Sequence, residues 1–119
     1  MNNLDRQLLF ACKVGHTKVV KLLLDLGADV NIDFGLSLKH SCYIGNIEIV
    51  KMLLEKGANL HIDNDYVLRQ ASLYGHSEMV KFLLENGADV NACGGSSLKW
   101  AMDNRHLDVI RLLIEYGAR

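Results

Sequence analysis

The stretch GHSEMVKFLLENGADVN, residues 75–91, has two earlier counterparts in the same chain. GHTKVVKLLLDLGADVN occupies residues 15–31 and GNIEIVKMLLEKGANLH occupies residues 45–61, so the motif returns every thirty residues. A unit of this size is too small to hold a hydrophobic core of its own, and neighbouring units must therefore stack. The sequence predicts one domain, residues 1–119, built from repeats at about 4–33, 34–63, 64–93 and 94–119.

Each repeat has the pattern of a helix, a turn, a second helix and a loop. In the third repeat, Met79, Val80 and Leu83 fall on one face of the second helix, whereas Glu78 and Lys81 fall on the other. A turn residue, glycine in three repeats, separates the two helices, and a glycine suited to an αL C-cap ends the second helix. The turn positions are Gly15, Gly45, Gly75 and Arg105, and the C-cap positions are Gly27, Gly57, Gly87 and Gly117. The predicted fold class is all-α, a helix-turn-helix solenoid of four stacked repeats.

The charge balance and the hydropathy pattern exclude several classes of function. Lys and Arg number 13 against 14 for Asp and Glu, which argues against a nucleic-acid partner and against a polybasic membrane patch. The longest apolar runs, such as Leu22–Leu24, are far too short to cross a membrane. The first ten residues, MNNLDRQLLF, lack the basic flank and cleavage site of a secretory signal. We therefore expect an intracellular, cytoplasmic protein.

The second helix and loop, in the pattern GH..VVK.LL..GADVN, resemble the ankyrin repeat over essentially the whole chain. The resemblance implies a protein-binding module with no enzymatic activity. The first helix departs from the family, because only the leucine of the Thr-Pro-Leu-His tetrad is retained, as in Leu36-Ser37-Leu38-Lys39. The segment DNDYVLRQASLYGHSEMVKFLLENGAD is similar to short, proline-poor ankyrin arrays of giant viruses of amoebae, which implies the host cytoplasm.

These departures predict local differences from the usual repeat. Without the proline, the first helices need other N-caps, for which Asp5, Asp65 and Ser96 are candidates. The repeat is also three residues shorter than is usual in the family, and the missing residues belong to the β-hairpin between repeats. Residues 31–35 and their counterparts are therefore expected to form simple turns with little strand.

Histidine and cysteine do not form a metal or disulfide pattern. Three histidines, His16, His76 and His106, occupy the same position in their repeats, which we call a column of the repeat alignment. Residues of one column should lie about 8 to 10 Å apart in neighbouring repeats. Zinc needs its ligands within about 2.0 to 2.3 Å of itself, so we expect no metal and no other cofactor. The family resemblance implies instead that this histidine bonds backbone in the turn. Cys12 and Cys42 share a column and read as core residues, whereas Cys93 is expected to be an exposed thiol. No catalytic constellation is present.

A basic ladder, Lys39, Arg69 and Lys99, replaces the family's histidine. Two interpretations remain open for it. The side chains could meet an acidic partner, or their stems could pack over the repeat junction with their charged ends bonded to loop carbonyls or to Asp33 and Asp63.

Partner binding is expected where equivalent positions of the repeats disagree, since repeat proteins bind through their concave side. The end of the first helix is such a place, and the resemblance locates the family's groove there. Tyrosine supplies contact area at low entropic cost. The candidates are Val14, Tyr43, Ile44, Leu73 and Tyr74, with Phe34, Tyr66 and Trp100 beside them and Asp103 and Asn104 as a polar end. Alternatively, Ile44 and Leu73 simply pack on the next repeat.

Other roles also remain open. The chain could be a structural spacer or a fragment of a longer array, or a substrate of asparagine hydroxylation, because Asn31 and Asn91 match the loop asparagine modified in some ankyrin proteins. The first repeat has the polar replacements Arg6, Gln7 and Thr17, which are expected of a capping unit. The last repeat keeps Leu107 and Ile114, so we expect either a longer natural array or an end-to-end, two-fold homodimer through the last repeat.

Overall fold

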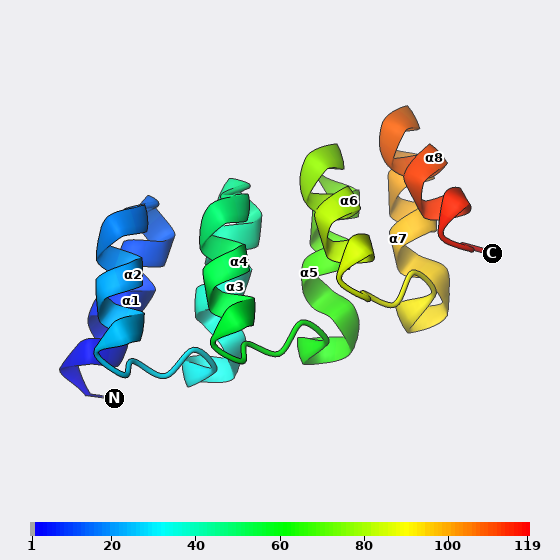
Figure 1. Ribbon diagram of the computed structural model, residues 1–119. Helices are drawn as coiled ribbons and strands as arrows, with labels where there is room; N and C mark the ends of the chain where they lie inside the picture. The colour runs from blue at the N-terminus through cyan, green and yellow to red at the C-terminus, as the bar shows by residue number, and fades with distance from the viewer. Residues whose placement is uncertain (1) are drawn as a thin grey trace. The chain divides into compact units, whose positions relative to one another are not determined.

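The structure is a computed structural model that describes residues 2–119, and these residues form eight α-helices and no strand. The helices are α1 (Asn3–Val14), α2 (Thr17–Asp25), α3 (Ile32–Ile44), α4 (Ile47–Glu55), α5 (Ile62–Leu73), α6 (Ser77–Glu85), α7 (Ala92–Asp103) and α8 (Leu107–Glu115). Figure 1 shows that consecutive helices form antiparallel pairs joined by short turns. The prediction of an all-α fold made of helix-turn-helix repeats is confirmed.

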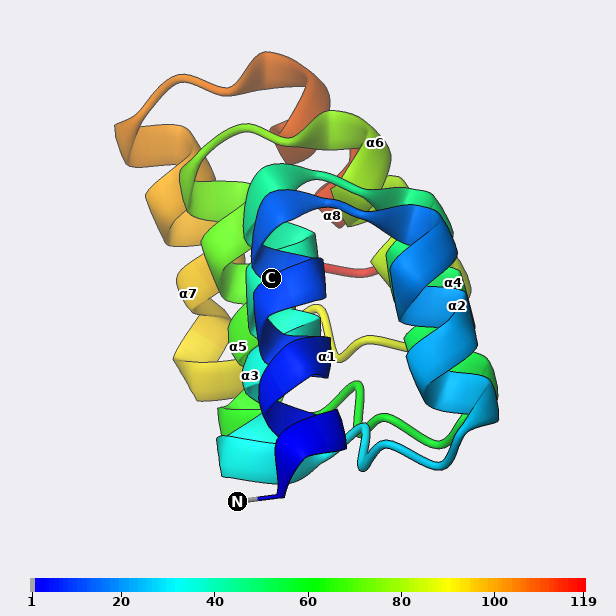
Figure 2. The same cartoon turned by 90° about the vertical axis from the view of Figure 1, so that its left-hand side faces the viewer.

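The chain divides into two compact units, Met1–Asn59 and Leu60–Arg119, each with two helix pairs. In the first unit, α1 packs against α2 and α3, and α2 packs against α4. Figure 2 shows α1 and α3 on one side of this unit and α2 and α4 on the other. In the second unit, α5 packs against α6 and α7, and α6 packs against α8. Both units therefore use the same packing of one repeat on the next.

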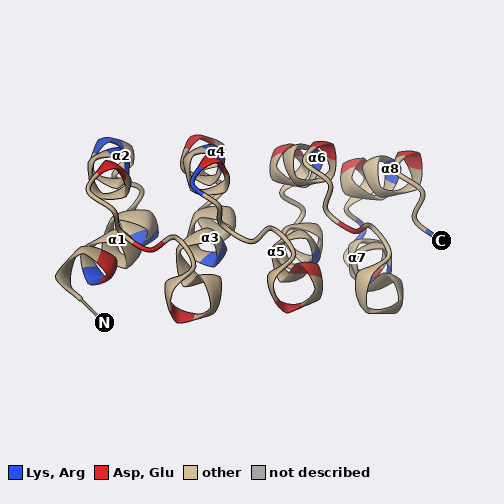
Figure 3. Cartoon of the chain, turned by 60° about the horizontal axis from the view of Figure 1, so that its bottom comes forward, with Lys and Arg blue, Asp and Glu red and all other residues tan. Residues whose placement is uncertain are grey.

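Each helix pair is stabilised by a small set of apolar side chains that recurs at equivalent positions. Leu8 and Val20 of the first repeat are fully buried, as are Leu38 and Val50 of the second. Burial of such a side chain contributes about 1.5 to 3 kcal/mol. The opposite face of the second helices is charged, and Figure 3 shows both signs of charge on α2, α4, α6 and α8. The period of the apolar residues thus decides which face of each helix is buried.

The turn between the two helices of a repeat requires a left-handed residue. Gly15 has φ 79° and ends α1, with its N–H donating to the carbonyl of Ala11. Arg105, at the equivalent position of the fourth repeat, also adopts a left-handed conformation, with φ 56°. The prediction that Arg105 continues the glycine column is therefore confirmed.

The loops between repeats contain three consecutive left-handed residues before the first helix of the next repeat. Residues 33–35 have φ values of 53°, 55° and 73°, and residues 63–65 and 93–95 follow the same course. The expected turns without strand are confirmed, but the left-handed turn was not predicted. Its sequence signal is the enrichment in Asp, Asn and Gly, the residues that tolerate this conformation best.

The predicted N-cap of the first helix is wrong. Asn2 caps α1 by accepting a hydrogen bond from the N–H of Asp5 at 2.9 Å. The carboxylate of Asp5 is buried and accepts from the N–H of Asp29 at 2.8 Å, so it fixes the following loop. Asp65 bonds His61 instead of capping α5, and the Ser96 hydroxyl donates to the carbonyl of Cys93.

Candidate functional site

The end of the first helix in the first unit presents exposed apolar and aromatic side chains. Tyr43 is 64% exposed, and Val14 and Ile44 are each nearly half exposed. Ile44 also approaches the preceding turn, since a Cβ on Gly15 would lie 3.5 Å from its Cδ1. Packing between repeats therefore accounts for part of Ile44 and leaves the rest of its side chain accessible.

In the second unit, the equivalent positions are more polar. Tyr74 is half exposed, with its ring centroid 6.2 Å from that of His76, whereas Leu73 is half-buried. Asp103 and Asn104 are exposed at the end of α7, and the Asn104 side chain donates to the carbonyl of Trp100 at 2.8 Å. At the ends of its first helices, the second unit thus carries one tyrosine, Tyr74, and a polar end.

An arginine-aromatic cluster lies at the start of the first helices of the second unit. Arg69 donates from Nε to the carbonyl of Asn64 at 3.0 Å and from an Nη to the carbonyl of Asp63 at 2.8 Å. Its guanidinium lies 5.7 Å from the Tyr66 ring centroid and 5.8 Å from that of Trp100. The interpretation of the basic ladder as bonded to loop carbonyls is confirmed for Arg69. Trp100 is half-buried, as its column indicated.

Phe34 is the most exposed of the candidate aromatic residues. It is 77% exposed and lies in the left-handed region, with φ 55°. Asn64 and Gly94 occupy the equivalent positions in the next two repeats. A left-handed conformation costs a residue other than Gly, Asn or Asp about 1 to 2 kcal/mol. The first unit therefore holds a strained phenylalanine in solvent at a position where the fold itself favours a small residue.

His106 takes a structural position at a repeat junction. The His106 Nε2 lies 2.9 Å from the carbonyl oxygen of Leu73, which agrees with the backbone bonding that the resemblance implied. Burial lowers the pKa of His40, and the nearby Lys13 ammonium lowers it further. No group of three or more His, Cys, Asp or Glu side chains within residues 2–119 is arranged to hold a metal ion.

The cysteines divide into two buried thiols and one exposed thiol, as expected. Burial raises the pKa of Cys42 to about 12. Burial also raises the pKa of Cys12, although the neighbouring side chains of Ser41 and Ser37 oppose the shift. Cys93 is exposed.

The loop asparagines form identical bridges to the next loop. Asn31 donates to the carbonyl of Gly57 at 3.1 Å and accepts from the N–H of Asn59 at 3.0 Å. Asn91 makes the same two bonds to the carbonyl of Gly117 and the N–H of Arg119, at 3.2 and 3.1 Å. These side chains therefore fix the loop geometry.

Both the first and the last repeat carry exposed apolar side chains. Leu107 is 71% exposed and Ile114 is 57% exposed in the fourth repeat. The first repeat exposes Phe10 at 63% and Leu22 at 58%. The expectation that the first repeat is a polar capping unit is therefore wrong, because exposed apolar side chains accompany the polar Arg6, Gln7 and Thr17.

Within residues 2–119, no helix is long and apolar enough to cross a membrane. A family model for ankyrin repeats, in three copies, matches residues 2–64 and 38–119. None of the curated proteins compared with the chain matches it. Ankyrin repeats are generally protein–protein interaction modules and typically have no enzymatic activity. With its paired helices, its left-handed turn residues and this match along its length, the chain belongs to the ankyrin repeat family.

Proposed function

We propose that this protein is a non-enzymatic interaction module that binds a protein partner through the ends of its first helices. The observation that carries the proposal is Tyr43, an aromatic side chain that is 64% exposed on a helix whose other face is fully buried. We call the proposed binding positions the first-helix surface. It comprises Val14, Tyr43 and Ile44 on the first unit and Leu73, Tyr74, Asp103 and Asn104 on the second.

The chemistry of this surface favours a partner segment with apolar side chains. Tyrosine offers a large contact area with only two side-chain torsions to fix, and its hydroxyl keeps a polar contact. The fold does not need these side chains for its own core, since the buried positions of α3 are Ser37, Leu38, Ser41 and Cys42 along with Gly35. Contact with a partner would bury these side chains, which the fold leaves exposed.

Phe34 gives independent support for binding by the first unit. Strained backbone conformations cluster at binding sites, where the surrounding structure tolerates their cost. Phe34 combines such a conformation with 77% exposure, and no feature of the fold requires a phenyl ring there. In the second unit, Tyr66 and Trp100 flank Arg69 and could add aromatic area to the contact.

The proposal is tested by capturing partners with the full chain and measuring the affinity of the purified pair by calorimetry. Tyr43→Ala combined with Tyr74→Ala should weaken binding by at least ~2 kcal/mol, as truncation of aromatic hot spots does. The single substitutions show which unit carries the contact. Tyr116→Ala removes an exposed tyrosine outside the first-helix surface and serves as the control. An unchanged affinity in a folded double variant would place the site elsewhere.

Two alternatives give different results in the same material. A structural spacer, or a piece of a longer array, would yield no partner whose affinity depends on the tyrosines. A substrate of asparagine hydroxylation would carry an added oxygen on Asn31 or Asn91 when isolated from eukaryotic cells. Because each asparagine bridges two backbone groups, a modifying enzyme would first have to open those bonds. We place binding in the cytoplasm, that of the host if the similarity to viral arrays holds.

A further inference from the structure

Two faces of the described chain expose apolar side chains at positions that are covered elsewhere in the same structure. We call Leu98, Met102, Leu107, Ile110 and Ile114 of the fourth repeat the C-terminal face, and Phe10, Val19 and Leu22 of the first repeat the N-terminal face. Burial at equivalent positions within each unit shows what kind of neighbour each face accepts.

The C-terminal face corresponds to the side of a repeat that receives the following repeat. In the first unit, Cys12 and Leu24 occupy the positions of Met102 and Ile114 and are buried where α1 meets α3 and α2 meets α4. Ser72 of the second unit is buried in the same way where α5 meets α7. Met102, by contrast, is 56% exposed.

The N-terminal face corresponds to the opposite side, which meets the preceding repeat. Val19 is 45% exposed, whereas its counterparts Ile49 and Val109 are 0% and 1% exposed in repeats that have a neighbour on this side. The two faces are therefore the two halves of a junction that the structure forms inside each unit.

We propose that this protein associates with itself head to tail, with the C-terminal face of one copy packed on the N-terminal face of the next. The occupant of each face is a second copy of the chain, in the register of the junctions within the units. Because the two surfaces differ, the contact is heterologous, and in the register of the internal junctions each added copy continues the array instead of closing a two-fold dimer.

One pair of side chains indicates which interaction would join the two copies. Within the second unit, the guanidinium of Arg69 lies 5.8 Å from the ring centroid of Trp100 in the following repeat. On the C-terminal face, Lys99 occupies the position of Arg69. On the N-terminal face, Phe10 occupies the position of Trp100, so these two positions again hold a cation and an aromatic ring. A cation over an aromatic face contributes about 0.5 to 1 kcal/mol at exposed sites. Both side chains are exposed, so both are accessible to another copy.

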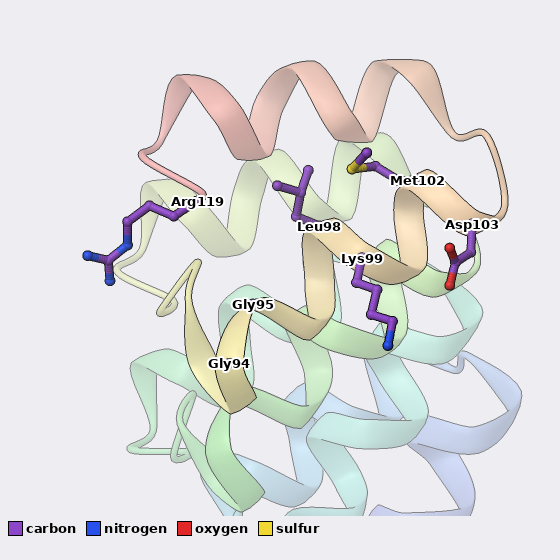
Figure 4. A pocket seen from close by; sticks show the side chains of 7 residues that line it. All are labelled: Gly94, Gly95, Leu98, Lys99, Met102, Asp103 and Arg119. Atoms are coloured by element: carbon purple, nitrogen blue, oxygen red, sulfur yellow. The ribbon is translucent and has the colours of Figure 1, made fainter.

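A pocket marks the place that the second copy would fill. It has a volume of about 260 Å³ and is lined by Leu98, Lys99, Met102 and Asp103, together with Gly94, Gly95 and Arg119. Figure 4 shows the first four of these side chains projecting from α7. The equivalent positions of α5 form the side against which α7 packs. The pocket on α7 thus corresponds to the surface of α5 that α7 covers within the second unit.

Arg105 limits how tightly the copies fit. At the corresponding turn, a Cβ on Gly75 would lie 2.5 Å from the ring of His106. Arg105 has a real Cβ at this position, so His16 of the incoming copy must turn away from the orientation that His106 adopts. The register therefore predicts weak association that depends on protein concentration, with Arg105 as the residue that weakens it.

Mixing two face variants of the full chain tests the proposal by light scattering and sedimentation. Met102→Glu with Ile114→Glu disables the C-terminal face, and Phe10→Glu with Leu22→Glu disables the N-terminal face. The wild-type weight-average mass should rise steadily above 13.3 kDa as concentration approaches about 1 mM. Each variant alone should stay monomeric, and their mixture should form a one-to-one pair that grows no further.

Lys18→Glu is the matched control. It changes the net charge by as much as either double variant, at a position that is exposed in all four repeats, as Glu48, Glu78 and Asp108 show. It should associate as the wild type does, and circular dichroism should show equal helicity in every variant. Two results overturn the proposal: a wild type that stays monomeric to about 1 mM, or an N-terminal-face variant that still self-associates, which indicates two-fold pairing through the last repeat.

A gain of association provides a second, independent measurement. Arg105→Gly restores the residue found at this turn in the other repeats and removes the obstruction to His16. The dissociation constant between copies should fall by roughly 5-fold or more, the equivalent of relieving about 1 kcal/mol. If Arg105→Gly leaves self-association unchanged, the copies do not meet in the register of the internal junctions, and the proposal is wrong.

Discussion

The imidazole Nε2 of His106 donates to the carbonyl oxygen of Leu73 across a repeat junction, at 2.9 Å. His106 is half-buried there, whereas His16 at the equivalent position of the first repeat is exposed. Identical residues in one column thus occupy different environments, and the difference can be measured.

His106→Ala should destabilise the protein by about 1 to 2 kcal/mol, because the Leu73 carbonyl loses its donor at a partly buried site. His16→Ala should change the free energy of unfolding by less than about 0.5 kcal/mol, as is usual for exposed positions. Urea denaturation of both variants provides the comparison. Equal effects would mean that the hydrogen bond between the repeats contributes nothing to stability.

Gly75→Ala should cost more than Gly15→Ala. Both glycines are left-handed, so each substitution carries a backbone strain of about 1 to 2 kcal/mol. At Gly75, the new Cβ would also lie 2.5 Å from the His106 ring, whereas at Gly15 its nearest contact is 3.5 Å from Ile44. We expect a further cost of roughly 1 to 3 kcal/mol at Gly75.

The double variant Gly75→Ala with His106→Ala separates strain from collision. If the ring is the obstacle, removing it recovers the additional cost, and the two substitutions are strongly non-additive. Additive free energies in this cycle would show that the backbone strain alone explains Gly75.

Phe34→Asn should stabilise the protein by about 0.5 to 1 kcal/mol, because asparagine tolerates the left-handed region better than phenylalanine. The reverse change, Asn64→Phe at the equivalent loop, should cost about as much and serves as the matched control. Thermal and urea denaturation measure both. If Phe34→Asn gains stability and loses partner affinity, the strain at Phe34 is maintained for binding. A loss of stability would show that the ring contributes to the fold.

The thiol of Cys42 should make stability fall in alkaline solution. Its pKa rises from an ordinary 9.0 to about 12 in the folded chain because the thiol is buried. The unfolded chain therefore releases this proton first, so the contribution of the thiol is complete below about pH 9 and is lost as the pH rises towards the folded pKa. Between about pH 8 and about pH 10.5, Cys42 should account for roughly 2 kcal/mol of the decline in unfolding free energy.

Cys42→Ala should show a correspondingly smaller decline over the same pH interval, whatever its stability at neutral pH. Cys93→Ala removes an exposed thiol and should decline as the wild type does. Identical pH profiles for the two variants would contradict the assignment of a buried, neutral thiol to Cys42.

Some features of this protein were determined by the sequence alone, because they depend on residues close together along the chain. The thirty-residue period, the apolar face of each second helix and the positions of the turns at Gly15 and Arg105 could all be predicted in this way. A helix period is a local property, and a positive φ is a requirement on a single residue. The exposure of Tyr43 and the half-burial of Trp100 could also be predicted by comparing equivalent positions of the repeats.

Only the tertiary structure decided the contacts that join one segment to another. Asp5 stands at a helix start, where the sequence predicts an N-cap, yet its carboxylate accepts from the N–H of Asp29, 24 residues away. The aromatic contact of Arg69 with Trp100 and the exposure of Phe10 likewise depend on whether a neighbouring repeat covers the position. Such interactions are set by the distance and orientation of groups brought together by packing, and spacing along the chain does not fix either.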